Sequence, residues 1–186
     1  IKCDCLAIAG GWTPAVHLFT QSGGKLKFRE EDQVFFPNIS QSKQISIGSC
    51  NGDFKLNEII KNLLLNVKNF LEIENTEYDS LKIECPSDNV KKNIWLLPSD
   101  KIIGKTKAFV DFQNDATAKD IKLALREGFR SIEHVKRYTT TGMGTDQGKL
   151  GNMHALGIIA DTAGVKMGEL GTTTFRPPYT PLTFGT

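Results

Sequence analysis

The residues best suited to chemistry lie in one stretch, residues 135–150. It packs three cations, four threonines and three glycines between two segments that have helical spacing. Hydroxyl groups, backbone N–H groups and cations beside a helix N-terminus bind phosphate, and glycine lets a ligand approach the backbone. The stretch therefore predicts an anion site, although a polar interhelical turn with a glycine C-cap would have the same composition. The residues concerned are Lys136, Arg137, Lys149, Thr139, Thr140, Thr141, Thr145, Gly142, Gly144 and Gly148.

A second stretch of interest lies near the start of the chain, where the apolar run 5–9 ends in Gly10-Gly11-Trp12-Thr13-Pro14. The run predicts a buried strand, and ligands of open α/β sheets bind where strands end in such turns. A simple exit from the strand is the alternative. The short apolar segment 15–20 follows, and His17 within it is interpreted as a packed, hydrogen-bonded side chain rather than a catalyst.

Neither nucleotide triphosphatase chemistry nor a nucleophile–base pair is indicated. The chain lacks a phosphate-loop pattern ending in Gly-Lys-Ser/Thr, and none of its histidines has a Cys or Ser partner at a motif spacing. The cysteines match no zinc pattern, so reduced thiols of a cytoplasmic protein are expected. The histidines are His17, His134 and His154, and the cysteines are Cys3, Cys5, Cys50 and Cys85.

The composition of the 186 residues, 39% hydrophobic and 24% charged, is typical of a globular protein. A net charge of +2 is too small to argue for a nucleic acid or an acidic membrane surface as partner. The most apolar segment, 59–65, is interrupted by Lys61 and Asn62, and no run approaches the roughly 20 residues of a membrane span. Because the chain begins with Ile1 rather than Met, its start looks like a cut within a longer protein.

The elements that would position these residues follow from periodicity and turn signals. In the first half we expect strands over 25–28, 34–38 and 44–48 and a helix from about residue 55. An irregular segment with short strands at 80–84 and 94–97 follows. In the second half we expect a strand over 108–112, helices over 118–127, 132–138 and 150–163, and an extended proline-rich tail. Ser131 is the expected cap of the second of these helices.

These residues resemble the alpha subunit of heterotetrameric sarcosine oxidase over nearly the whole chain. Among the matching motifs are Arg-Ser-Ile-Glu-His-Val-Lys-Arg-Tyr-Thr-Thr and Thr-Thr-Thr-Phe-Arg-Pro-Pro-Tyr. The matching segments are 10–18, 107–115, 126–140, 142–149 and 172–179.

The resemblance implies an α/β fold joined to a small α-rich domain, taken from the middle of a longer polypeptide. Residues 1–71 would be the C-terminal part of a dinucleotide-binding (pyridine-nucleotide oxidoreductase) domain, and 72–106 a linker. Residues 107–170 would form a small helical domain similar to the bacterioferritin-associated ferredoxins. The extended tail, 171–186, would lead to a folate-binding domain that is not in this chain.

The ferredoxin-like domain is expected to lack its [2Fe–2S] cluster, and no metal site is expected elsewhere. Domains of that type carry cysteines where this chain has Asp111, Gln113 and Asp146. A [2Fe–2S] cluster needs four soft ligands, normally thiolates, which these side chains do not supply.

The resemblance also implies NAD in the dinucleotide crevice. Flavoprotein disulfide reductases end the late strand in Gly-Asp, whose carboxylate binds FAD, whereas here Ser49 follows Gly48. This departure agrees with NAD rather than FAD in the crevice. The residues expected to contact NAD are Gly10, Gly11, Trp12, Thr13, Leu18 and Thr20.

The implied reaction is the oxidative demethylation of the amine sarcosine, an oxidoreductase function shared among alpha, beta, gamma and delta subunits. FAD in the beta subunit would oxidise the N-methyl group, FMN at the alpha–beta interface would receive the electrons, and tetrahydrofolate would take the one-carbon unit. The central stretch would form the alpha-side wall of the FMN site. Arg137 and Lys149 would offset the phosphate charge, Thr139, Thr140 and Thr145 would donate hydroxyls, and Gln147 would bind ring or ribityl oxygens.

No residue of this chain is expected to be catalytic, and the chain is expected to be inactive alone, without nucleic-acid or membrane partners. Two alternatives remain open. One is a non-catalytic module that assembles subunits, and the other is the equivalent subunit of an N-methylglutamate or opine dehydrogenase.

Overall fold

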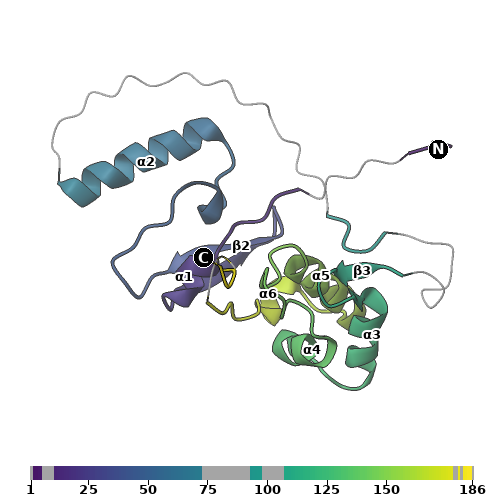
Figure 1. Cartoon of the computed structure of the whole chain (residues 1–186). Coiled ribbons are helices and arrows are strands. Elements are labelled where there is room, and N and C mark those ends of the chain that lie inside the picture. The colour runs from purple at the N-terminus through teal and green to yellow at the C-terminus, as the bar shows by residue number, and fades with distance from the viewer. Residues whose placement is uncertain are drawn as a thin grey trace.

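The computed structural model describes residues 2–5, 11–72, 93–97, 107–177, 180 and 182–185. Residues 6–9 of the strand predicted at 5–9 lie outside the described residues, as do Gly10 and the strand predicted at 80–84. The elements follow one another in two groups along the chain, and Figure 1 shows both.

The first group is built around a two-stranded hairpin. Helix α1 (His17–Gln21) precedes β1 (Lys25–Arg29) and β2 (Val34–Ile39), which pair antiparallel with a register shift next to Lys25. The 3₁₀ helix η1 (Gly48–Asn51) and the long helix α2 (Leu56–Leu71) follow. The predicted strands at 25–28 and 34–38 and the predicted helix near 55 are therefore confirmed.

Helix α2 stands apart from the other helices (Figure 1). None of its residues is buried by the described part of the chain, and its closest packing is against η1. Six of its large apolar side chains are exposed, up to 66% for Phe70. The exposed set is Leu56, Leu63, Leu65, Val67, Phe70 and Leu71.

The second group is a small helical bundle with a short hairpin at its start. The hairpin pairs β3 (Phe109–Asp111) with β4 (Ala116–Thr117) and leads into α3 (Ala118–Arg126). Helices α4 (Ile132–Thr139), α5 (Asn152–Ala163) and α6 (Met167–Leu170) follow. The three predicted helices of this half are thus confirmed, within one to two residues at their ends.

Local capping explains why these helices begin and end where they do. A reciprocal capping box joins Thr117 and Asp120 at the start of α3: each side chain accepts a hydrogen bond from the other residue's backbone N–H. Gly164 ends α5 in the left-handed region, where glycine carries no Cβ penalty. Ser131 is the N-cap residue of α4, but its side chain makes no capping hydrogen bond with the described residues.

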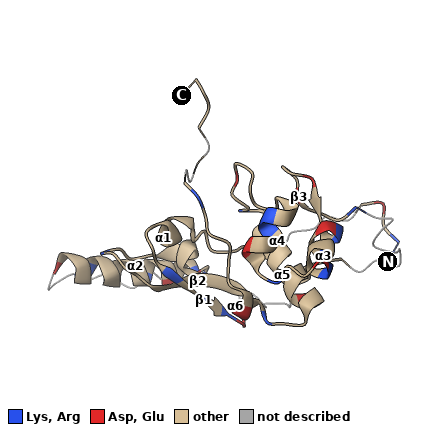
Figure 2. Ribbon diagram, turned by 90° about the horizontal axis from the view of Figure 1, so that it is seen from below, with Lys and Arg blue, Asp and Glu red and all other residues tan. Residues whose placement is uncertain are grey.

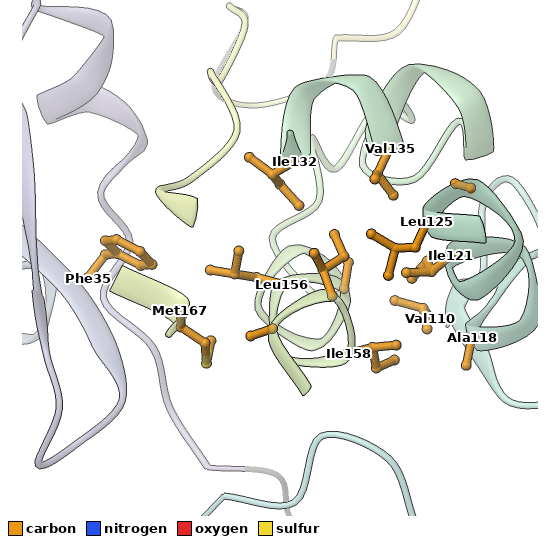
Figure 3. Close-up of a cluster of buried hydrophobic side chains, with 14 residues drawn as sticks. Phe35, Val110, Ala118, Ile121, Leu125, Ile132, Val135, Leu156, Ile158 and Met167 are labelled. Carbon is orange, nitrogen blue, oxygen red and sulfur yellow. The ribbon is translucent and has the colours of Figure 1, made fainter. Parts of the chain in front are cut away.

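The core lies between α3, α4 and α5 and extends to the first group (Figure 3). Ile121, Val135, Leu156 and Ile159 are its largest fully buried side chains. Phe35 of β2 belongs to the same cluster. The hairpin and the helical bundle therefore share apolar packing rather than being joined by a linker alone.

Two predicted strands are wrong. Residues 44–47 form no strand because the chain reaches Gly48 in a left-handed conformation and turns into η1. Residues 94–97 form a bend, not a strand. There the Trp95 indole packs on Gly157 of α5, where an added Cβ would overlap it, and meets His154 edge-on at 5.9 Å. Aromatic packing on a helix replaces the strand pairing that the sequence pattern favoured.

Acidic and basic residues are interspersed along the ribbon (Figure 2). No helix in the described part of the chain is long and apolar enough to cross a bilayer.

Candidate functional site

The central stretch, residues 135–150, folds as a tight loop between α4 and α5. It turns through four left-handed residues, Thr140, Gly142, Gln147 and Gly148. A Cβ at either glycine would overlap the side chain of Asn152. Asn152 donates from its amide to the Gln147 carbonyl and to the Thr173 hydroxyl, at 3.2 and 2.9 Å. The glycines thus leave room for the side chain that ties the loop to the chain beyond α6.

The buried carboxylate of Asp111 holds the loop to the β3–β4 hairpin. It accepts the backbone N–H groups of Gly142, Gln113 and Asn114 at 2.6, 2.8 and 3.1 Å. Burial alone would raise the pKa of this carboxyl, but the hydrogen bonds from Gly142 and Asn114 outweigh it and lower the pKa.

The three positions that would carry cluster ligands in the ferredoxin-type domain are linked by hydrogen bonds. Gln113 accepts the Asp146 N–H at 3.2 Å through its side-chain carbonyl and donates to the Thr145 hydroxyl at 3.0 Å. Asp146 in turn accepts the Gly148 N–H at 3.0 Å. These polar groups pair with one another and with the loop backbone.

An open cleft of about 650 Å³ lies between α4, the loop and the segment after α6. We call it the cationic cleft, and its charged lining consists of Lys136, Arg137, Arg176 and Glu133. The segment after α6, residues 171–177, is here called the strap. The remaining lining residues are Met143, Gln147, Thr174 and Pro177.

The walls of the cationic cleft are held by ion pairing and by backbone contacts. Arg137 pairs with Glu133 at 3.1 Å and donates to its backbone carbonyl at 2.8 Å. Glu133 also accepts the Thr174 N–H at 2.6 Å, while the Lys136 ammonium donates to the Thr174 carbonyl at 3.3 Å. Gln147 accepts the Arg176 N–H at 3.1 Å. Side chains of α4 and the loop thus hold the strap by hydrogen bonds to its backbone.

The cations of the cleft are close enough to affect one another. Burial lowers the pKa of Lys136, Glu133 acts in the opposite direction, and Arg137 and Arg176 lower it further. The charges of Arg137 and Arg176 therefore reach the Lys136 ammonium.

The residues predicted for FMN separate into three places. Arg137 and Gln147 line the cationic cleft together. The Thr139 hydroxyl is buried and donates to the Val135 carbonyl at 2.8 Å, and Thr140 and Thr145 are exposed. Lys149 lines two other cavities.

Three of the residues predicted for NAD come together with Lys149. Gly11, Trp12 and Thr13 line a cavity of about 460 Å³ that we call the aromatic cavity, because Trp12, Phe54 and Trp95 all contribute to it. Leu18 is exposed on α1 and is not part of its lining, and the Thr20 hydroxyl donates to the His17 carbonyl at 2.9 Å.

His17 is packed, as predicted, beneath the strap. Its ring lies 3.7 Å from the ring of Phe175, and the residue is 6% exposed. Burial, and to a smaller extent the charge of Lys149, lower its pKa from 6.5 to about 4, against the opposing charge of Asp146. His17 is therefore a neutral packing residue near pH 7.

Comparison with known proteins finds sarcosine oxidase sequences similar to this chain. The sarcosine oxidase A3 domain matches residues 105–186. The sarcosine oxidase alpha chain of Rhizobium meliloti (strain 1021) is 39% identical over all of this chain. That of Corynebacterium sp. (strain P-1) is 34% identical over 98% of it. Over nearly its whole length the chain is therefore similar to sarcosine oxidase alpha subunits. It spans 19% and 20% of the lengths of these two relatives, so it corresponds to about one fifth of each.

Two further likenesses are more partial. An opine oxidase subunit of Rhizobium meliloti (strain 1021) is 35% identical over 71 residues, which cover 38% of this chain and 16% of that protein. The crystal structure of L-proline dehydrogenase from P. horikoshii matches 94% of this chain and 37% of its own, with a TM-score of 0.67 and 19% identity. This structural likeness shows a shared fold, and it fits the predicted dinucleotide-binding type of fold.

Two cations of the cationic cleft are not among the predicted FMN contacts. Lys136 belongs to the stretch predicted as an anion site, but only Arg137 and Lys149 are predicted to offset the phosphate charge of FMN. Arg176 lies 39 positions beyond Arg137, in the proline-rich tail. Lys136 could have been predicted because it directly precedes Arg137, a predicted site residue. Arg176 could not, because only the fold brings the strap next to α4.

Proposed function

We propose that this chain is part of the alpha subunit of a sarcosine-oxidase-like complex that oxidatively demethylates sarcosine. The observation that carries the proposal is identity of 32–39% with three sarcosine oxidase alpha subunits over nearly the whole chain. On this proposal the chain contributes cofactor contacts, and no residue in it is catalytic. Its partners are the beta, gamma and delta subunits of a heterotetramer in the cytoplasm.

The proposed FMN contacts are Arg137 and Gln147 in the cationic cleft. A volume of about 650 Å³ lies within the range of small-molecule sites, and the cleft offers cations and an amide that suit a phosphate and polar oxygens. FMN, when bound, would accept and pass on electrons, and this chain would hold and orient it. Thr139 serves the loop's own hydrogen bonding, so we assign it a structural part rather than a phosphate contact.

The proposed NAD contacts are Gly11, Trp12 and Thr13 in the aromatic cavity. Its volume of about 460 Å³ also lies within the range of ligand sites, and aromatic walls with few polar groups are typical of them. FAD and tetrahydrofolate are proposed for other parts of the complex. Removal of the indole in Trp12→Ala should weaken NAD binding to the intact protein several-fold in equilibrium dialysis.

The decisive test uses the intact complex, purified with the subunits that accompany it. We expect bound flavin, bleaching of its absorbance by sarcosine, and loss of most of the FMN in Arg137→Ala while the complex still assembles. Arg130→Ala, which removes an exposed arginine outside the cleft, is the matched control and should keep its FMN. A complex without flavin, or one that sarcosine does not reduce, contradicts the proposal. If an opine, and not sarcosine, reduces the bound flavin, the complex is the opine-oxidase variant.

A second candidate function is assembly of subunits without cofactor contact. The observation in its favour is the apolar surface of α2, which the described part of the chain leaves open. If Leu63→Lys in α2 disrupts the complex, and Arg137→Ala leaves both the complex and its FMN intact, assembly is the better description of this chain.

A further inference from the structure

A third cavity, of about 40 Å³, lies beneath the strap, and we call it the inner cavity. Its lining comes from four parts of the fold: Val16 and His17 at the start of α1, Phe35 of β2, Leu156 of α5 and Phe175 of the strap. All five residues are buried. The inner cavity therefore belongs to the interior of the protein rather than to its surface.

The wall of the inner cavity is mostly apolar. His17 contributes a neutral ring near pH 7, because burial lowers its pKa from 6.5 to about 4. The amide of Asn152, another lining residue, already donates to the Gln147 carbonyl and the Thr173 hydroxyl. Among the described lining residues Lys149 alone is charged at this pH. It also lines the open aromatic cavity, where a long side chain can keep its ammonium in water.

This lining suits a small apolar guest better than water. A buried water needs about two to four polar partners, and cavities that lack them bind apolar guests such as xenon. The volume of about 40 Å³ exceeds the roughly 10–15 Å³ that one water-sized molecule requires, and it is far below the roughly 300 Å³ at which pockets for drug-sized ligands begin. The inner cavity therefore has room for a small gas molecule, but not for an organic substrate or cofactor.

The inner cavity lies behind the wall of the cationic cleft. Phe175 of the strap lines the cavity, whereas its neighbours Thr174 and Arg176 line the cleft. In the loop, Gly148 lines the cavity and the preceding residue, Gln147, lines the cleft. A single layer of loop and strap therefore separates a gas-sized cavity from the site proposed for FMN.

We propose that the inner cavity binds dioxygen. Dioxygen is a neutral, apolar molecule, so its transfer from water into an apolar cavity is favourable. The step is binding alone, in which no bond forms or breaks. That dioxygen is the guest, rather than another apolar gas, rests on the function proposed above, because an oxidase whose flavin has been reduced by substrate must pass the electrons to an oxidant.

Crystals of the intact protein, purified with the subunits that accompany it, test the binding. They are pressurised in parallel with xenon, which is located by its anomalous scattering, and with dioxygen. We expect both gases in the space between Val16, Leu156 and Phe175.

Variants that change the volume of the inner cavity sharpen this test. Val16→Ile adds a methylene to its wall and should lower the xenon occupancy by about twofold or more, because a packed interior has little other space for the added group. Val110→Ile adds the same group to the core outside the described lining and is the matched control. If Val16→Ile does not fold, Leu156→Val, which enlarges the cavity, should raise the xenon occupancy.

The use of dioxygen is tested by stopped-flow absorbance. The complex is reduced by sarcosine without air and then mixed with dissolved dioxygen. Val16→Ile should slow the reoxidation of the flavin by about the same factor as it lowers the xenon occupancy, whereas Val110→Ile should reoxidise as the parent does.

The proposal is overturned if neither gas enters the inner cavity, if ordered water fills it instead, or if Val110→Ile loses as much xenon as Val16→Ile. It is also overturned if the gases bind but the flavin of Val16→Ile reoxidises as fast as that of the parent. Should dioxygen bind in a complex that contains no flavin, the function proposed above fails and the gas site stands. Should sarcosine reduce a bound flavin while the cavity takes no gas, that function stands and the dioxygen site fails.

Discussion

The buried ring of His17 predicts a defined loss of stability on mild acidification. Burial is the main cause that lowers the pKa of His17 from 6.5 to about 4 in the folded protein. The unfolded chain takes up the proton as the pH falls through 6.5, whereas the folded chain does so only near pH 4. Between these values the unfolded state binds more protons, so the free energy of unfolding falls as the pH falls.

The size of the effect follows from the same shift. Each pKa unit corresponds to about 1.4 kcal/mol, so the total loss is roughly 3 kcal/mol by pH 4. About 2 kcal/mol of it should appear between pH 7.5 and pH 5. Asp111, whose pKa lies below its ordinary 3.8, contributes only below that window.

The assay is urea denaturation of the purified protein at several pH values from 7.5 to 5. His17→Phe keeps an aromatic ring against Phe175 but cannot titrate, so its stability should change far less over this range. His154→Gln removes an exposed histidine and should retain the parent's dependence. A His17→Phe slope equal to that of the parent would refute the reasoning. If that variant does not fold, an NMR titration of His17 in the parent decides, and a pKa near 6.5 would contradict the prediction.

Two substitutions test the architecture of the loop. Asp111→Asn weakens the acceptor of the Gly142 N–H, and we expect it to lower the free energy of unfolding by about 1–3 kcal/mol, measured by urea denaturation. An unchanged value would show that the carboxylate does not hold the loop. Gly148→Ala should cost more than Gly164→Ala in thermal unfolding, because an added Cβ at Gly148 overlaps Asn152 while at Gly164 it meets nothing within 4 Å. Equal costs would show that only the left-handed backbone matters at both positions.

The parts of the fold that could be predicted are those determined by neighbouring residues. Helix α3 begins after Thr117 because the capping box lies within four residues, and α5 ends at Gly164 because glycine accepts the left-handed conformation. The prediction of a strand at 94–97 is wrong because the conformation there depends on a distant residue. The conformation there follows from the packing of Trp95 on Gly157, which lies 62 residues further along the chain, and no local pattern contains that contact.

The candidate site, too, could be predicted only in part. Arg137 and Gln147 were both selected from the central stretch, and both line the cationic cleft. Lys149 was selected with them, but the left-handed backbone at Gln147 and Gly148 sends it to the aromatic cavity. Composition gives the residue types of a phosphate site, but the turn decides which of them face the same side.

The position of Arg176 depends both on a local sequence pattern and on a tertiary contact. An extended segment points successive side chains to opposite sides. In the strap, Thr173 and Phe175 are buried against Asn152 and His17, while Thr174 and Arg176 are exposed and line the cleft. The alternation could be read from the prolines that keep the tail extended, but which set faces α4 depends on Phe175 packing on His17, 158 positions earlier in the chain. The same stacking that buries His17 therefore also determines that Arg176, rather than Phe175, lines the cationic cleft.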